Sequence, residues 1–231
     1  IMNEILETSS YFGLALTLFI FWIAHKISQK TKISFLNPIL VASAIIIVIL
    51  LVCDIEYETY ETGASLLSLL LTPATICYAV PLYRQIQVLK KNVAAIIISV
   101  LCGSFSSIAL VFGFSLLFRF DSQIYHSLLP KSVTTAIGIG LSEEMGGLTA
   151  ITIAAIMITG LFGGAAAVGI CRLFHITDPV AKGLAIGTAS HAVGTSKAIE
   201  LGEVEGAMSG LAIVISGLMT VLWSSMASGW L

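Results

Sequence analysis

Charged side chains are scarce in this sequence. Aspartate, glutamate, lysine and arginine make up 10% of the 231 residues, whereas an ordinary soluble domain carries about 25%. Apolar residues reach 57%, and the mean hydropathy is +1.01. This composition excludes a soluble globular domain. The net charge of −2, without any basic patch, gives no indication of nucleic-acid binding. We therefore expect a protein of the lipid bilayer.

Residues suited to metal or covalent chemistry are equally sparse. The four cysteines lie within apolar stretches and show no Cys-x-x-Cys or Cys/His ligand spacing, which favours free thiols. No nucleophile elbow, phosphate-binding loop, metal-binding helix motif or carboxylate pair can be recognised. We expect no metal, no cofactor and no enzymatic activity. The cysteines are Cys53, Cys77, Cys102 and Cys171.

Long windows without charge recur along the chain, and a membrane span needs about 20 apolar residues. The long windows are 8–25, 33–53, 62–83, 92–118, 145–171 and 206–231. Two further windows, 132–142 and 183–196, are too short for simple spans. The sequence therefore predicts an all-α, polytopic transmembrane helical bundle, built as one integral membrane domain over residues 1–231. An extra N-terminal helix is expected over 8–27.

The charges between the windows predict an orientation, because cytoplasmic loops carry an excess of lysine and arginine. The basic positions Arg84, Lys90, Lys91, Arg172 and Lys182 are therefore expected in the cytoplasm. The acidic stretch 54–61 and the three acids at 200, 203 and 205 are expected outside. This arrangement places the N-terminus outside and the C-terminus inside, with segment 127–146 as a re-entrant or broken element.

A weak internal repeat relates residues 72–98 to residues 188–214. Each begins with a threonine-rich break, passes a polar connector and enters a long apolar run. The connectors carry opposite charge, which predicts an inverted repeat with discontinuous helices of the kind found in transporters. The first repeat is expected over about 34–118 and the second over about 127–231.

Three stretches break the apolar pattern with proline, glycine and hydroxyl residues. Irregular backbone at membrane depth persists only inside protein or beside water, and a helix that begins there attracts anions. The expected helix breaks are Pro73, Pro81, Gly187 and Gly194. The candidate substrate-binding residues are Thr72, Thr75, Tyr78, Lys131, Ser132, Thr134, Thr135, Thr188, Ser190, His191, Thr195 and Lys197.

These residues also have structural interpretations. Serine and threonine hydroxyls often bond to a carbonyl of the preceding helical turn, and a lysine such as Lys197 can extend to the membrane surface. His191 is either a polar group satisfied inside the helix packing or a titratable group that couples solute movement to a proton.

The same stretches resemble the LrgB/CidB family. The matching segments are LNPILVA (36–42), PATICYAVPLY (73–83), LPKSVTTAI (129–137) and GLAIGTASHAVGTSKAIELGEVEGAMSGLAI (183–213). The likeness covers nearly the whole chain. It implies a multi-pass protein of the inner (cytoplasmic) membrane, described in bacteria as antiholin-like and linked to murein hydrolase regulation. It also implies a small LrgA/CidA-type membrane partner, and we expect a homodimer.

Two functions follow from this reading. The first is a proton-coupled carrier for a small organic anion, namely a monocarboxylate such as glycolate, glycerate, lactate or pyruvate, as a plant relative of the family implies. The second is an antiholin or holin-like regulator of cell lysis that acts by oligomerisation. The opposed, hydroxyl-rich breaks favour the carrier, because a regulator has no physical need for them.

Overall fold

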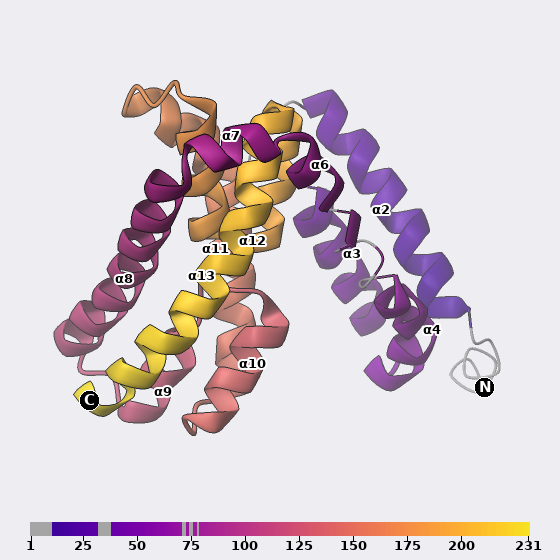
Figure 1. The fold of residues 1–231 in the computed structure, drawn as a ribbon. Helices are drawn as coiled ribbons and strands as arrows, with labels where there is room; N and C mark the ends of the chain where they lie inside the picture. Colours follow the sequence, from indigo (N-terminus) through magenta and orange to yellow (C-terminus); the bar gives the residue numbers. More distant parts are fainter. Residues whose placement is uncertain (1–10, 32–37, 71–72, 74–75, 78) are drawn as a thin grey trace. The chain divides into compact units, whose positions relative to one another are not determined.

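The computed structural model describes residues 11–31, 38–70, 73, 76–77 and 79–231. The regular elements in these ranges are all helical. The chain forms two compact units, Ile1–Ala79 and Val80–Leu231, which are considered separately (Figure 1). Within the described residues, four helices are long and apolar enough to cross a membrane. The predicted all-α membrane bundle is thereby confirmed, whereas its division into repeats stays a prediction.

The first unit contains α2 (Phe12–Thr31), α3 (Pro38–Val52) and α4 (Tyr57–Leu69). Helices α2 and α4 approach closely because Gly13 and Gly63 face each other. The Thr17 and Tyr60 hydroxyls share a hydrogen bond of 2.8 Å beside this contact. Half of the acidic stretch predicted as a loop belongs to α4, where Glu58 lies in the first turn and suits the partial positive charge of a helix N-terminus.

The second unit contains the remaining helices, three of which (α8, α11 and α13) are candidate spans. The elements are α6 (Ala79–Arg84), α7 (Ile86–Lys91), α8 (Val93–Phe118), α9 (Ser122–Leu128), α10 (Thr135–Glu144), α11 (Thr149–Leu173), α12 (Pro179–Leu201), α13 (Glu203–Ala227) and the 3-10 turn η1 (Ser228–Trp230).

Helices α8 and α13 run in the same direction. Ile96, early in α8, packs with Met208, early in α13. Further along, the Trp223 indole N–H donates to Ser104 Oγ at 3.2 Å. Both helices therefore begin at one end of the unit, which we call the Asn92 end, and finish at the other, which we call the Arg119 end.

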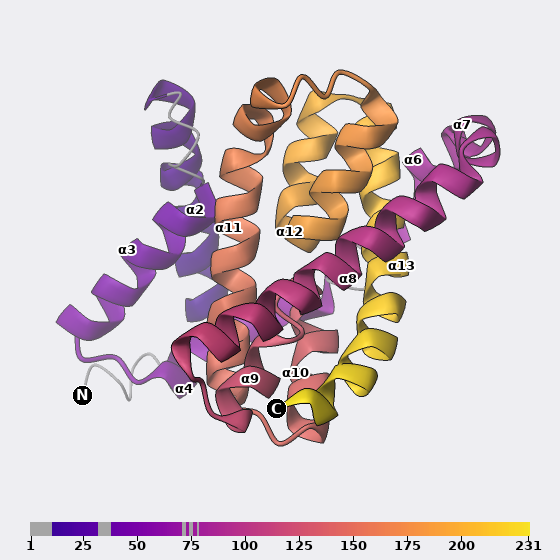
Figure 2. The ribbon, with the colours of Figure 1, turned by 90° about the vertical axis from the view of Figure 1, so that its left-hand side faces the viewer.

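Helix α12 is a hairpin rather than a straight rod. At its midpoint His191 has φ 41° and ψ −139°, outside the helical region. A Cβ added at Gly194 would lie 3.0 Å from Ile186 Cγ2, whereas eight residues of straight helix span about 12 Å. The chain thus reverses at His191, and the two arms lie side by side (Figure 2). The first arm begins at the Asn92 end and the second arm finishes there, because Gly183 in the first arm lies against Glu205 at the start of α13.

The α9–α10 segment is a second re-entrant element, and it enters from the opposite end. At the Arg119 end, the Tyr125 hydroxyl of α9 donates to Ala227 O at 2.9 Å. The chain returns to the same region after α10, where Leu148 N donates to Ser127 Oγ at 2.7 Å. Between the two helices, Lys131 reaches Ser107, near the middle of α8. The re-entrant course predicted for 127–146 is therefore confirmed.

The hairpin in α12 corrects the predicted orientation. Glu203 and Glu205 lie at the same end as Lys182, because α12 turns back at His191 instead of crossing. Lys90 also lies there, since its neighbour Leu89 packs against the same apolar cluster as Val204. The prediction that the two polar connectors face opposite sides is wrong, and so is the prediction that the C-terminus shares a side with Lys182. Two elements do enter the unit from opposite ends, namely the α9–α10 segment and α12. They are not the pair 72–98 and 188–214 that the sequence predicted.

Side-specific labelling tests this arrangement. We expect cysteines placed at Lys90 and Glu203 to react with a membrane-impermeant maleimide from one face, and a cysteine at Glu143 to react from the other. The four native cysteines are first replaced by serine or alanine. Labelling of the Lys90 and Glu203 positions from opposite faces would contradict a hairpin in α12.

Candidate functional site

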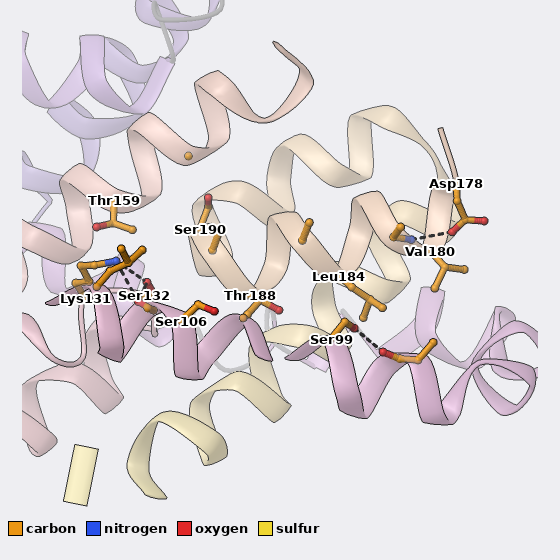
Figure 3. Close-up of a pocket in the computed structure, with 18 of the residues that line it drawn as sticks. Ser99, Ser106, Lys131, Ser132, Thr159, Asp178, Val180, Leu184, Thr188 and Ser190 are labelled. Atoms are coloured by element: carbon orange, nitrogen blue, oxygen red, sulfur yellow. Dashed lines mark hydrogen bonds between the residues drawn. The ribbon is translucent and has the colours of Figure 1, made fainter. Parts of the chain in front are cut away.

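The tips of the two re-entrant elements meet at one cavity of about 680 Å³ in the second unit (Figure 3). The α9–α10 tip contributes Lys131 and Ser132, and the α12 tip contributes Thr188 and Ser190. These four were predicted as site residues from separate sequence segments, and the structure brings them together. The other polar lining residues are Asn92, Ser99, Ser106, Ser107, Thr159 and Asp178.

One wall of the cavity is a face of α8 that the sequence analysis missed. Its small and polar residues recur every three or four positions, as one helix face requires. They are Asn92, Ala95, Ser99, Gly103, Ser106 and Ser107. The rest of α8 is largely isoleucine, leucine, valine and phenylalanine, so this periodic polar stripe was the available signal. It was overlooked because α8 contains no proline and no charge.

Lys131 is the one cation among the described residues that line the cavity. Its ammonium donates to Ser107 Oγ at 3.1 Å and to Ser132 Oγ at 3.2 Å. The two hydroxyls lie 3.0 Å apart and share a hydrogen bond. Lys131 and Ser132 stand at one end of the row of lining residues, and Asp178 stands at the other (Figure 3).

Glycines on the neighbouring helices admit the α12 tip. A Cβ at Gly103 of α8 would lie 2.8 Å from Thr188 Cγ2, and a Cβ at Gly163 of α11 would collide with Ser190 Oγ. Because small residues allow membrane helices to approach closely, both hydroxyl side chains reach the cavity wall. Thr188 and Ser190 are otherwise buried, with 8% and 1% of their surface exposed.

His191 lies behind the cavity and does not line it. The side chain is buried, and its Nε2 lies 3.0 Å from the carbonyl oxygen of Ile156 on α11. A Cβ at Gly160 would lie 2.6 Å from the ring, so the ring occupies a notch in α11. Direct contact between His191 and a solute in the cavity, as the sequence analysis expected, is therefore not what the structure provides. A role in proton coupling stays a prediction.

Four more predicted residues lie outside the cavity lining. Thr195 Oγ1 donates to His191 O at 2.9 Å and bonds to Ser209 Oγ at 2.7 Å, so it supports the hairpin. Thr134 is the N-cap of α10 and Thr135 its first residue. Lys197 forms an ion pair of 2.6 Å with Glu200. Its pairing within one arm of α12 agrees with the surface role considered for it.

The predicted helix breaks receive different outcomes. Gly187 and Gly194 are helical, and the break lies at His191 between them. Gly187 serves close packing instead, because a Cβ there would lie 2.8 Å from Ser209 Cα. Pro81 lies within α6 and does not end this helix.

The other predictions for the first break concern residues 72–78. Thr72, Thr75 and Tyr78 lie outside the described residues. Pro73 is described as an exposed helical residue, but both of its neighbours are outside the described range.

The geometry suits reversible binding of a small polar anion. Hydroxyl groups both donate and accept hydrogen bonds, and a lysine ammonium supplies three donors and one positive charge. The cavity reaches the Asn92 end, where Asp178 is exposed, and on α8 its lining extends no further than Leu110. The cavity therefore runs along α8 from the exposed Asp178 at the Asn92 end to Lys131 beside the middle of the helix.

Comparison with known proteins identifies the family of this chain. The model of the LrgB-like family matches residues 17–230. The antiholin-like protein LrgB of Bacillus cereus (strain B4264) is 38% identical over 213 residues, which cover 92% of this chain and 93% of the relative. The antiholin-like protein LrgB of Bacillus anthracis (strain A0248) shows the same identity and coverage. No solved structure matches. The chain belongs to the LrgB-like family.

Proposed function

We propose that this protein carries small monocarboxylates, of the glycolate, glycerate, lactate or pyruvate type, across the cytoplasmic membrane together with a proton. The observation that supports this proposal is the meeting of two oppositely directed re-entrant tips at a hydroxyl-lined cavity. Discontinuous helices that meet at a central site are typical of secondary transporters. The cavity is large enough for a C2–C3 acid, and Lys131 supplies the opposite charge.

One end of the cavity lies at the Asn92 end of the second unit, where Asp178 is exposed. The Asn92 end carries most of the basic residues of the second unit, including Lys90, Lys91, Arg172 and Lys182. By the positive-inside bias this end faces the cytoplasm. The exposed Asp178 end of the cavity then faces the cytoplasm in the proposed carrier.

A second candidate function is regulation of murein hydrolases and lysis as an antiholin, through oligomerisation with itself or with a small LrgA/CidA-type protein. The relatives are named antiholin-like, and these names support this candidate more directly than they support transport. We place it second because oligomerisation alone does not require a half-buried lysine and hydroxyl groups around one cavity.

Uptake into proteoliposomes separates the two functions. We expect radiolabelled C2–C3 acids to enter vesicles with saturable kinetics, to accumulate when a proton gradient is imposed, and to show counterflow against unlabelled acid inside. Empty vesicles and vesicles with an unrelated membrane protein are the controls. Acid entry that neither saturates nor shows counterflow, at protein densities verified by immunoblot, would rule out a carrier and favour the pore-forming or regulatory candidate.

A further inference from the structure

Lys131 occupies an unusual position for a charged side chain. It lies on the α9–α10 tip, half-buried, beside the middle of α8. Charged groups this deep in a membrane protein are costly unless another charge or several hydrogen bonds compensate them. Two of its three N–H donors are used by Ser107 and Ser132.

The described residues supply no opposite charge for Lys131. The described ion pair, Lys197 with Glu200, lies elsewhere. Asp178 lines the same cavity but lies at its other end (Figure 3). Val180, two residues further on, packs against the same apolar cluster as Leu89, which places Asp178 at the Asn92 end. Asn92 and Ser107 are 15 positions apart along α8, which corresponds to about 22 Å of helix. A direct bond between Asp178 and Lys131 is therefore impossible in this conformation.

We infer that Lys131, Ser107 and Ser132 form the seat of the substrate carboxylate, so that the bound anion itself supplies the missing counter-charge. One oxygen of the carboxylate accepts from the third N–H of Lys131. The Ser107 and Ser132 hydroxyls, which now bond to each other, can turn to donate to the anion. This inference rests on the proposed transport function and deepens it by naming the residues that bind the carboxylate of the substrate.

The other two candidate cationic groups are less suited to this task. Nε2 of His191 is taken by Ile156 O, and the ring lies behind the cavity wall. Lys197 already has a carboxylate partner at 2.6 Å, and it does not line the cavity. The carboxylate site is thus shared between the α9–α10 tip and α8, and not located on α12, which holds five of the twelve predicted site residues.

The test compares an acid with its uncharged amide in proteoliposomes. We expect labelled glycolate to be inhibited far better by unlabelled glycolate than by glycolamide in the unmodified protein. In Lys131→Gln the half-saturating glycolate concentration should rise about tenfold to a hundredfold, because hydrogen bonds to a charged group are lost. The inhibition constant of glycolamide should change little, so the preference for the acid disappears. Lys131→Arg should keep the preference.

Lys197→Gln is the matched control, since it removes a lysine of the same unit that lies outside the cavity. It should leave both constants unchanged. A purely structural role of Lys131 would weaken acid and amide equally, and that result would overturn the inference. If Lys131→Gln shows counterflow and still prefers the acid, the seat lies elsewhere while the proposed function stands.

A measurement on the unmodified protein avoids any dependence on folding of the variant. Lys131 is acetylated with an amine-reactive reagent in detergent, and its peptide is quantified by mass spectrometry. We expect saturating glycolate, but not glycolamide, to slow modification of Lys131 severalfold, with Lys197 unaffected. Equal modification of Lys131 with and without glycolate would overturn the inference that Lys131 binds the carboxylate. If transport is absent but glycolate protects Lys131, the seat stands as an anion-binding site and the carrier function fails.

Discussion

Replacing Gly163 with alanine should cost most of the transport activity. The new methyl group would collide with Ser190 Oγ, so the α12 tip must move away from α11. Overpacking of this kind typically costs about 1–3 kcal/mol of unfolding free energy. The displaced tip also carries Thr188 into a new position in the cavity wall. Because misplacement of site groups by about 1 Å can be severe, we expect initial uptake rates to fall on the order of tenfold.

Gly169→Ala is the control for this experiment. It lies on the same helix, and a Cβ there would meet nothing within 4 Å. Alanine is the better helix former by about 1 kcal/mol, so this variant should be as stable as the original or slightly more so. Uptake by reconstituted vesicles and thermal unfolding in detergent measure the two effects. Equal uptake by the Gly163 and Gly169 variants would show that the α11–α12 contact does not position the site.

Replacing His191 with alanine should destabilise the protein by about 2–4 kcal/mol. The change leaves the buried Ile156 carbonyl without its partner and opens a void over Gly160. The strained backbone at φ 41° would remain. Glycine adopts this conformation freely, so His191→Gly should relieve about 1–3 kcal/mol of strain and be the more stable variant of the two. Thermal unfolding in detergent shows which of the two variants is more stable.

His175 provides the matched comparison, because it also has a positive φ, of 54°, but is exposed. His175→Ala should lower the unfolding temperature far less than His191→Ala. If His191→Ala proves at least as stable as His191→Gly, the backbone at the hairpin tip is not strained and the reversal of α12 has another cause. Uptake by the same variants under an imposed proton gradient examines the separate prediction that His191 couples transport to protons.

The sequence predicted the helical bundle and four of the ten polar residues that line the cavity, for a local reason. Hydrophobic windows of span length have one physical outcome in water and lipid, so α8, α11 and α13 appear where the windows lie. Breaks crowded with hydroxyls cannot face lipid, and Ser132, Thr188 and Ser190, which were predicted as site residues, line one cavity. That this cavity binds a substrate stays a prediction. These conclusions depend on composition within about 20 residues and need no knowledge of neighbours.

The lining residues of α8, which the sequence analysis missed, lie in a helix without a break. Ser99, Ser106 and Ser107 belong to an uninterrupted helix, where a hydroxyl commonly bonds to the preceding turn, as Ser99 does with Ala95 O at 2.6 Å. Only the approach of the α12 tip to Gly103, and of Lys131 to Ser107, makes this face a cavity wall. Likewise His191 was placed in the site by its sequence neighbours, but its side chain points to α11.

By itself, the sequence determined that the chain enters a membrane as helices and that the segments around Lys131 and His191 interrupt them, because hydropathy and helix breaking are local properties. The tertiary structure alone decided the direction of those segments. The backbone of His191 turns α12 back to the end where it began, and this reversal brings Glu203 to the same side as Lys182. A charge rule that assumes a crossing at each apolar window cannot detect such a turn, because the reversal depends on packing of α12 against α11 and α13.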